Sequence, residues 1–412
     1  YNRPRFLASP AIPLAAGQAV SVLSPYGGTL LLEFSHATPG QAVTVTLQGV
    51  AKHPFLDADI GGNATAFINA LNSSGFDWAE IKMNGLEIHS RADRMKNVIS
   101  TTYGNDARRY LDEIRLFLHD DIYQLAGFSG FALPAAVLNF CSNAQWSCTD
   151  ASLHQLPDTQ HFNIDAYTQC GDGCSGQPID LKNMDPRGAG ESHEMGHNMQ
   201  VGNLMIYAGI SAEVSNEIFP LHKYWRLLRD YGDDRTYSDM RYDSAFNMIR
   251  NARQDTDPIE SVYQQMWKDT SYAAQSGERR VFYMQWMHYW TQRMASVERG
   301  WDIFTLLYLH ERQLRKADWA TYKDRLGYSR YASRPAENGN DNMLIALSWI
   351  TKRDQRATFD LWGIRYSAAA STQVASYGFA REPAFYYAKV VQNDYSDVRK
   401  VDMTVADPVW PF

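Results

Sequence analysis

The chain carries two histidines and a glutamate whose spacing could bind and use a metal ion. In the stretch GESHEMGHNMQ (190–200), His193 and His197 are four residues apart. Positions four apart lie one turn apart on the same face of an α-helix, so both imidazoles could bind one ion. Glu194 would then lie beside the ion, where a carboxylate can take a proton from an attacking water molecule. The pattern predicts a metal site with Glu194 as general base, and two histidines on an ordinary surface helix are the alternative.

A catalytic zinc ion needs a third protein ligand, which must come from an element that follows this helix. Gly202 is predicted to end the first helix, and Ser211 to cap a second helix that begins SAEVSNEIF. Glu213 falls in the first turn of that second helix, and Glu217 falls one turn later on the same face. We predict that Glu213 is the third ligand. We also predict that Glu217 accepts a hydrogen bond from a ligand imidazole.

Other catalytic layouts do not fit this sequence. The metzincin pattern requires a glycine at position 200 and a histidine at position 203, but the chain has Gln200 and Asn203. The spacing of gluzincin aminopeptidases would place the glutamate at position 216, which is Asn216. Neither a G-x-S-x-G nucleophile elbow nor a glycine-rich phosphate loop occurs. A zinc site completed by Glu213 is therefore the layout that the sequence favours.

The segment ahead of the site is predicted to form strands. Residues 11–60 alternate in polarity, as in QAVTVTLQGV, where Val43, Val45 and Leu47 fall on one face. A small antiparallel β unit is the expected result.

The rest of the chain is predicted to be mixed and then helical. Helical spacing covers 106–127, and helices dominate 191–362. Between them, 128–190 is expected to be irregular, with short strands at 132–140 and 162–169.

These elements predict an α+β fold class, with a small N-terminal β unit followed by a mainly helical, gluzincin-like zincin catalytic domain. We expect a β-rich subdomain over 1–104 and the zinc metallopeptidase domain over 105–382. An extended C-terminal tail over 383–412 is expected to pack on the catalytic domain.

Composition and charge exclude some classes of function. The net charge of −7 argues against nucleic acid as a partner, because phosphate binding needs clustered lysine and arginine. No apolar run reaches the ~18 residues that a transmembrane helix needs, so the sequence predicts no membrane span. The chain begins at Tyr1 with neither an initiator methionine nor a signal peptide. We therefore expect it to be part of a longer multidomain protein.

The cysteines form two close couples just ahead of the histidines, Cys141 with Cys148 and Cys170 with Cys174. Two short disulfide loops would stiffen this turn-rich segment in an oxidising compartment, which predicts an exported protein. A structural zinc site is the alternative, but neither spacing is the usual C-x2-C. Pairing within each couple is favoured, although spacing alone leaves the connectivity open.

Together these residues resemble a known family. GESHEMGHNMQ followed by AEVSNEIFPL is similar to the enhancin-like family of gluzincin metallopeptidases, which includes secreted bacterial mucinases. In that family H-E-x-x-H continues as G-H-N-x-Q and is followed by a glutamate in an E-V-[ST]-N-type helix. Here the continuation runs from Gly196 to Gln200, and the glutamate is Glu213. The likeness extends to SPYGG near residue 24 and to LWGIRYSAAASTQVASYGFA (361–380), so it covers most of the chain.

The resemblance implies a secreted or cell-surface bacterial zinc endopeptidase that cleaves O-glycosylated, mucin-type proteins with one Zn²⁺ as cofactor. A catalytically silent adhesin module that binds mucin or glycan on a zincin fold is the alternative. A zinc peptidase acting on unglycosylated protein is a third possibility. The intact set His193, Glu194, His197 and Glu213 favours an enzyme.

A zinc peptidase also needs a donor for the oxyanion of its tetrahedral intermediate. His222, His288 and Tyr289 are candidates by residue type. Side chains on aromatic-rich helices more often belong to the core, so we assign none of them to this role.

Overall fold

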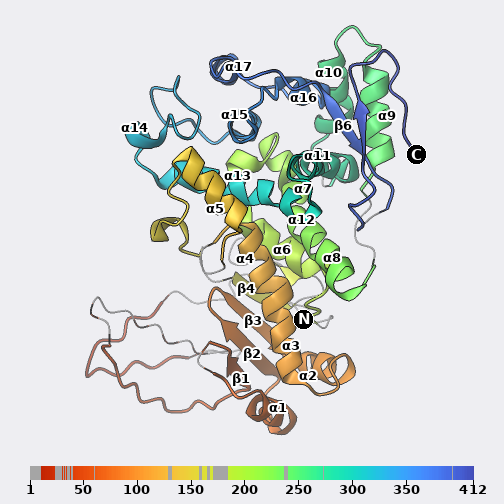
Figure 1. The fold of residues 1–412 in the computed structure, drawn as a ribbon. Helices are drawn as coiled ribbons and strands as arrows, with labels where there is room; N and C mark the ends of the chain where they lie inside the picture. Colours follow the sequence, from red (N-terminus) through yellow and green to blue (C-terminus); the bar gives the residue numbers. More distant parts are fainter. Residues whose placement is uncertain are drawn as a thin grey trace.

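A small sheet at one end and a mainly helical body make up the chain in a computed structural model (Figure 1). The structure describes residues 11–23, 30, 32, 34, 38, 40–59, 61–128, 132–156, 160–164, 168–169, 184–235, 240–271, 273–391 and 393–412. Among these residues, no helix is both long and apolar enough to cross a bilayer. The α+β fold class is confirmed.

The sheet is mixed and has the strand order β1-β2-β3-β4-β5. β2 and β3 form an antiparallel hairpin, whereas β1 runs parallel to β2, and β4 runs parallel to β3. The strands are β1 (Phe55–Asp57), β2 (Trp78–Met83), β3 (Leu86–Arg91), β4 (Gln160–Ile164) and β5 (Thr168–Gln169). The hairpin turns at Asn84-Gly85, where Gly85 has φ +79°, a conformation that glycine adopts without strain.

Two helices, α1 (Ala64–Ser73) and α2 (Ala92–Thr101), pack against this sheet. β4 comes from beyond residue 104, so the sheet takes strands from both sides of the predicted boundary. The predicted division into three units is not tested by this arrangement and stays a prediction.

Of the strands predicted over residues 11–60, only β1 occurs among the described residues. The described residues of 11–52 form no strand, and Val43 and Leu47 are 55% and 47% exposed. Alternating polarity alone does not make a strand, because a strand also needs a partner to pair with. The described part of this segment has no such partner, whereas the β2–β3 hairpin pairs locally across a two-residue turn.

The long helical stretch predicted at 106–127 is confirmed. It consists of α3 (Ala107–Ile114), a π-helical segment η1 (Arg115–Asp120) and α4 (Asp121–Leu125), and Gly127 follows with φ +73°. Together α3, η1 and α4 form a helical rod, which runs from the sheet into the helical body (Figure 1).

The mixed segment after this rod matches the prediction only in part. The segment predicted as one strand at 162–169 contains parts of two short strands, β4 and β5, which pair antiparallel, and residues 165–167 lie outside the described residues. The strand predicted at 132–140 is wrong, because helix α5 (Ala135–Ala144) begins directly after Pro134. Proline has no N–H to give to a sheet, and the fixed φ of its ring suits the start of a helix.

One of the two predicted disulfides lies within the described residues. Cys141 and Cys148 are bonded, with their Cα atoms 6.0 Å apart, which confirms pairing within the first couple. Cys170 and Cys174 lie outside the described residues. The closed loop carries Trp146, whose ring packs on His310 of the helical body.

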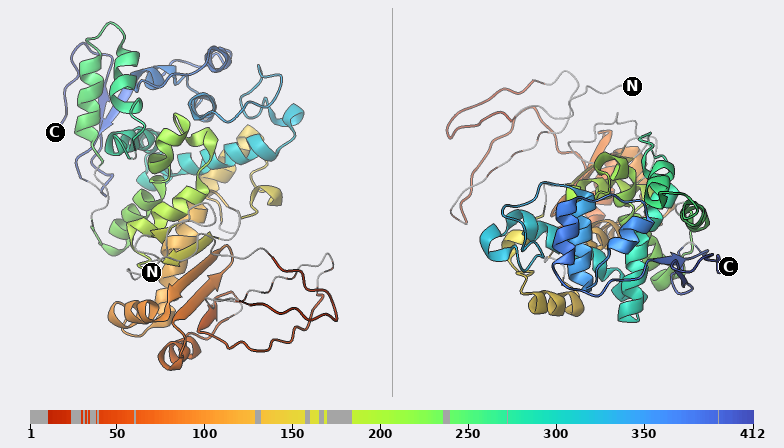
Figure 2. Two further views of the ribbon diagram at one scale, coloured as in Figure 1. Left: turned by 180° about the vertical axis from the view of Figure 1, so that it is seen from behind. Right: turned by 90° about the horizontal axis from the view of Figure 1, so that it is seen from above.

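The helical body follows and has its core around α11 (Ser276–Met294), where Trp286 and Phe282 are fully buried. Helices α11 and α13 lie next to each other at the centre of the body (Figures 1 and 2). The other helices before α11 are η2 (Ala151–Leu153), α6 (Ala189–Met199), η3 (Gly202–Leu204), η4 (Ala208–Ser211), α7 (Ala212–Ser215), α8 (Ile218–Tyr231), α9 (Tyr242–Ala252), α10 (Pro258–Val262) and η5 (Tyr263–Trp267). Those after it are α12 (Val297–Gly300), α13 (Asp302–Lys316), α14 (Trp319–Tyr322), α15 (Gly339–Thr351), α16 (Arg356–Leu361) and α17 (Ala368–Ala375).

The C-terminal segment folds back on this body. β6 (Phe385–Ala388) pairs antiparallel with β7 (Arg399–Asp402), and all four residues of β6 are buried. β6 packs against α9 and α11.

A buried charge cluster on the sheet makes its stability depend on pH. Glu80 accepts hydrogen bonds from His89 (2.9 Å) and His53 (3.0 Å). Burial by itself lowers the pKa of His89, but hydrogen bonds to Glu80 and Glu87 outweigh burial and raise this pKa to about 9. Burial by itself raises the pKa of Glu80, but the two histidines outweigh it and lower this pKa to about 2.

We expect a His89→Gln variant to lose most stability in weakly acidic solution. The contribution of His89 is complete below its unfolded pKa of about 6.5 and is lost as pH rises through about 9. The contribution of Glu80 is complete above its unfolded pKa of about 4.5 and is lost as pH falls through about 2. Thermal unfolding followed by circular dichroism should therefore show the largest difference from the parent protein between pH 4.5 and 6.5. A difference that stays constant up to pH 10 would contradict this account.

Candidate metal centre

The predicted metal-binding residues meet between helix α6 and the short helix α7. α6 presents His193 and His197, whose Nε2 atoms are 3.2 Å apart. A carboxylate oxygen of Glu213, from α7, lies 3.2 Å from His193 Nε2, and its other oxygen lies 3.6 Å from His197 Nε2. One ligand atom from each of the three side chains lies within 4.8 Å of the other two. No other such group of histidine, cysteine and acidic side chains occurs in the described residues.

Glu194 lies where the sequence predicted, beside this group rather than within it. Its Oε1 atom is 4.0 Å from His193 Nε2. The carboxylate is partly exposed, with 22% of its side-chain surface accessible, so a substrate and a water molecule could reach it.

The backbone at Glu213 departs from helical geometry, with φ −90° and ψ 20°. These angles fall in a sparsely occupied region of backbone conformation that many active-site residues adopt. Ser211 is the N-cap residue of this helix, as predicted, but its hydroxyl donates to the Ile206 carbonyl and makes no capping hydrogen bond. The first helix also ends earlier than predicted, with Gln200 as its C-cap instead of Gly202.

Each histidine is fixed through its other ring nitrogen. His193 Nδ1 donates to Glu217 Oε1 at 2.9 Å, as the sequence predicted for Glu217. Because an ionised carboxylate can only accept, His193 carries a proton on Nδ1, and Nε2 is the ring nitrogen that faces Glu213 and would bind an ion. His197 Nδ1 lies 3.0 Å from Gln200 Oε1, whose amide group donates to the Ala212 carbonyl.

Several supporting residues were missed from the sequence. Arg280, from α11, pairs with the buried Glu217 carboxylate at 2.9 Å. The Asn216 side chain donates to the His193 carbonyl at 3.2 Å. Gln200, which contacts His197, belongs to the G-H-N-x-Q pattern, so this pattern could have identified it as a supporting residue. No local signal marks Arg280, because it lies far along the chain from the histidines.

A glycine on α6 allows the two ligand-bearing elements to approach each other closely. A Cβ atom added to Gly196 would lie 2.7 Å from the Asn216 carbonyl oxygen and 3.0 Å from Phe219 Cδ2. Any larger residue would therefore push α6 away from the segment that carries Glu213 and Glu217.

The carboxylates around the histidines determine the charge of the site. Hydrogen bonds from His193 and His197 hold the pKa of Glu213 well below its usual range. Burial by itself lowers the pKa of His193, but hydrogen bonds to Glu213 and Glu217 outweigh burial and raise the pKa to about 10. The site therefore favours a positive charge between the three side chains.

The other histidine and tyrosine candidates lie away from this group. His288 is buried and hydrogen-bonds Tyr242 at 2.8 Å. Tyr289 stacks on Phe385, and His222 pairs with the buried Asp121. None of these three contacts a predicted ligand in the interactions of the described residues.

A comparison with known proteins identifies a relative that matches over the whole chain. The immunomodulating metalloprotease of Pseudomonas aeruginosa is 48% identical over 426 aligned residues, which cover 100% of this chain and 46% of the relative. The chain is a homologue of this metalloprotease. The resemblance to enhancin-like metallopeptidases is thereby confirmed, although no family model matches the sequence.

Solved structures agree with this relationship. The IMPa metallopeptidase from Pseudomonas aeruginosa superposes with a TM-score of 0.82 at 46% identity, over 88% of this chain and 42% of that chain. IMPa in complex with an O-glycopeptide gives a TM-score of 0.83 at the same identity and coverage. The chain thus has the metallopeptidase fold. It spans 46% of the length of the metalloprotease that it matches.

Proposed function

We propose that this chain is the catalytic part of a secreted zinc endopeptidase that cleaves O-glycosylated, mucin-type proteins. The convergence of His193, His197 and Glu213 beside Glu194 carries the proposal. Homology to a metalloprotease over the full length of the chain supports it.

The donor set fits a single zinc ion. Two imidazole nitrogens and one carboxylate are the protein ligands of many catalytic zinc sites, which keep a further position open. Both Nε2 atoms face the Glu213 carboxylate, and both Nδ1 atoms are engaged by Glu217 and Gln200. The ring orientations are therefore set before an ion binds.

The chemistry of peptide cleavage can be assigned to residues of this chain. When bound, zinc supplies Lewis-acid activation of a water molecule and of the peptide carbonyl. Glu194 takes the proton of the attacking water and passes it to the leaving amine. Glu217 keeps the His193 proton on Nδ1, and Arg280 balances the buried charge of Glu217.

Two further observations support the substrate class and the location. IMPa, at 46% identity, has been solved with an O-glycopeptide and with T-antigen. The disulfide between Cys141 and Cys148 suits an oxidising compartment, as expected for an exported protein.

Digestion of a defined O-glycopeptide, followed by mass spectrometry, tests the proposal. We expect products from the glycosylated peptide, none in the presence of a zinc chelator, and recovery when zinc is added back. A matched peptide without the glycan should stay intact. Products that persist in the chelator would refute the metal mechanism, and equal cleavage of both peptides would refute glycan recognition.

A further inference from the structure

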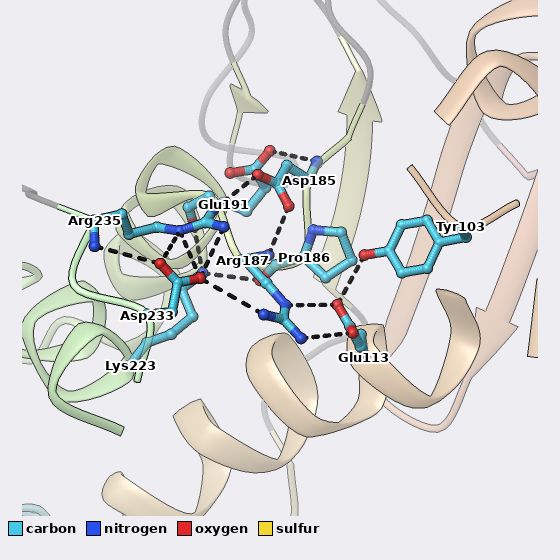
Figure 3. A network of polar contacts seen from close by, with 10 residues as sticks. Tyr103, Glu113, Asp185, Pro186, Arg187, Glu191, Lys223, Asp233 and Arg235 are labelled. Atoms are coloured by element: carbon cyan, nitrogen blue, oxygen red, sulfur yellow. Dashed lines mark hydrogen bonds and ion pairs between the residues drawn. The ribbon is translucent and has the colours of Figure 1, made fainter. Parts of the chain in front are cut away.

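A fully buried lysine holds the turn from which the metal-binding helix begins. Lys223, on α8, is 0% exposed. Its ammonium group donates to the Pro186 carbonyl at 3.1 Å and to the Gly188 carbonyl (Figure 3). Gly188 is the N-cap of α6, so Lys223 binds the carbonyl of the cap residue of the helix that carries His193 and His197, together with one carbonyl of the turn before it.

The buried carboxylate of Glu191, on α6, also contacts this turn. Glu191 is 8% exposed, and its carboxylate accepts a hydrogen bond from the Asp185 N–H at 3.0 Å. The carboxylate lies so close to Gly188 that a Cβ atom added there would collide with Glu191 Oε2. Lys223 provides the nearby positive charge for this carboxylate. The turn is therefore packed around an acid and a base that are both removed from solvent.

Arg187 ties the same turn to the long rod that comes from the sheet. Its guanidinium group donates to both oxygens of Glu113 on α3, at 2.8 Å each (Figure 3). It also lies over the rings of Phe117 and Tyr231. The start of α6 is thus held by α3 on one side and by α8 on the other.

The contacts between α6 and the segment Asn216–Tyr231 define one register. His193 meets Glu217, Gly196 meets Asn216 and Phe219, and Gly188 meets Lys223. As residue numbers increase along α6, the residues that they contact have decreasing numbers along the segment Asn216–Tyr231. The two elements therefore run antiparallel. Of these contacts, the one between Lys223 and Gly188 lies at the start of α6, where it would oppose sliding of α6 along its partner.

We propose that Lys223 is a positioning residue of the metal site, which sets the register of the two histidines against Glu213. This inference rests on the proposed function. Lys223 touches no predicted ligand, so it acts only through the backbone of the 185–188 turn. A shift of about 1 Å at this turn would move both imidazoles together, and ligand geometry tolerates little such displacement.

The test is a Lys223→Met variant, which keeps the length of the side chain and removes its three donors. We expect zinc affinity, measured by competition with a chelating dye, to fall about tenfold, the lower end of the effect seen for residues that support metal ligands. We also expect the visible absorption spectrum of the cobalt-loaded protein to change, because it reports the geometry around the ion.

Arg229→Met is the matched control, since it removes one positive charge from the exposed end of the same helix. It should keep the parent's zinc affinity and cobalt spectrum. If Lys223→Met does not fold, Gly188→Ala disturbs the same turn without changing charge and should have the same effects. A folded variant of either kind with the parent's zinc affinity and spectrum would overturn the inference. Absence of zinc binding by the parent protein would instead refute the proposed function.

Discussion

A Glu194→Gln variant is expected to bind one zinc ion per chain and to cleave an O-glycopeptide roughly 10²–10⁴-fold more slowly than the parent, the usual range for loss of a general base. Glutamine has nearly the same shape as glutamate but cannot take a proton at neutral pH. Because Glu194 lies outside the group of ligand atoms, the substitution leaves His193, His197 and Glu213 in place. Single-turnover cleavage and metal content measured on the same sample provide the check.

The same variant separates an enzyme from a catalytically silent binding module. A binding module would bind glycopeptide equally well with or without the substitution and would show no cleavage in either form. Loss of zinc from Glu194→Gln would show that Glu194 is itself a ligand. Unchanged cleavage with zinc retained would show that another residue takes the proton.

The second large effect is expected at Glu213. A Glu213→Gln variant replaces a charged ligand by a weaker neutral one, so we expect zinc affinity to fall by more than the roughly 10–100-fold that follows loss of a residue supporting a ligand. Glu217→Gln should lower affinity by about 10–100-fold, because Glu217 supports His193 and does not face the ion. Competition with a chelator of known affinity measures both variants under one set of conditions.

Glu298→Gln is the matched control for this pair, since Glu298 keeps 73% of its side-chain surface exposed and lies on α12. It should bind zinc as the parent does. If Glu217→Gln instead binds zinc more weakly than Glu213→Gln, then Glu217 is the metal ligand and Glu213 is the supporting residue.

The candidate site could be predicted from the sequence because its members are close together along the chain. His193, Glu194 and His197 lie on successive turns of α6, and Glu213 lies in the first turn of α7, a short distance further along the chain. Helical periodicity relates such residues directly, and no knowledge of the tertiary fold is needed. The residues that support them obey no such rule. Packing of α11 brings Arg280 to Glu217, and packing of α8 brings Lys223 to the turn before α6, and the sequence alone reveals neither contact.

The fold could be predicted in its class but not in the position of its first strands. The helices have a strong periodic signal, and 106–127 was located correctly. The alternation around Val43 has an equally clear period, but a strand forms only when it pairs with another strand, which can lie far away in the sequence. β3 pairs with β4, although the helices α3 and α4 lie between these two strands in the sequence.

The contact between Arg280 and Glu217 also limits how far this chain could be shortened without disturbing the proposed site. A fragment from GESHEMGHNMQ to the end of the glutamate helix would hold every proposed ligand, yet it would lack the guanidinium group that neutralises Glu217. Protein engineers who trim this chain should therefore treat α11 as indispensable, since without it an acid would be left uncompensated beside the first histidine.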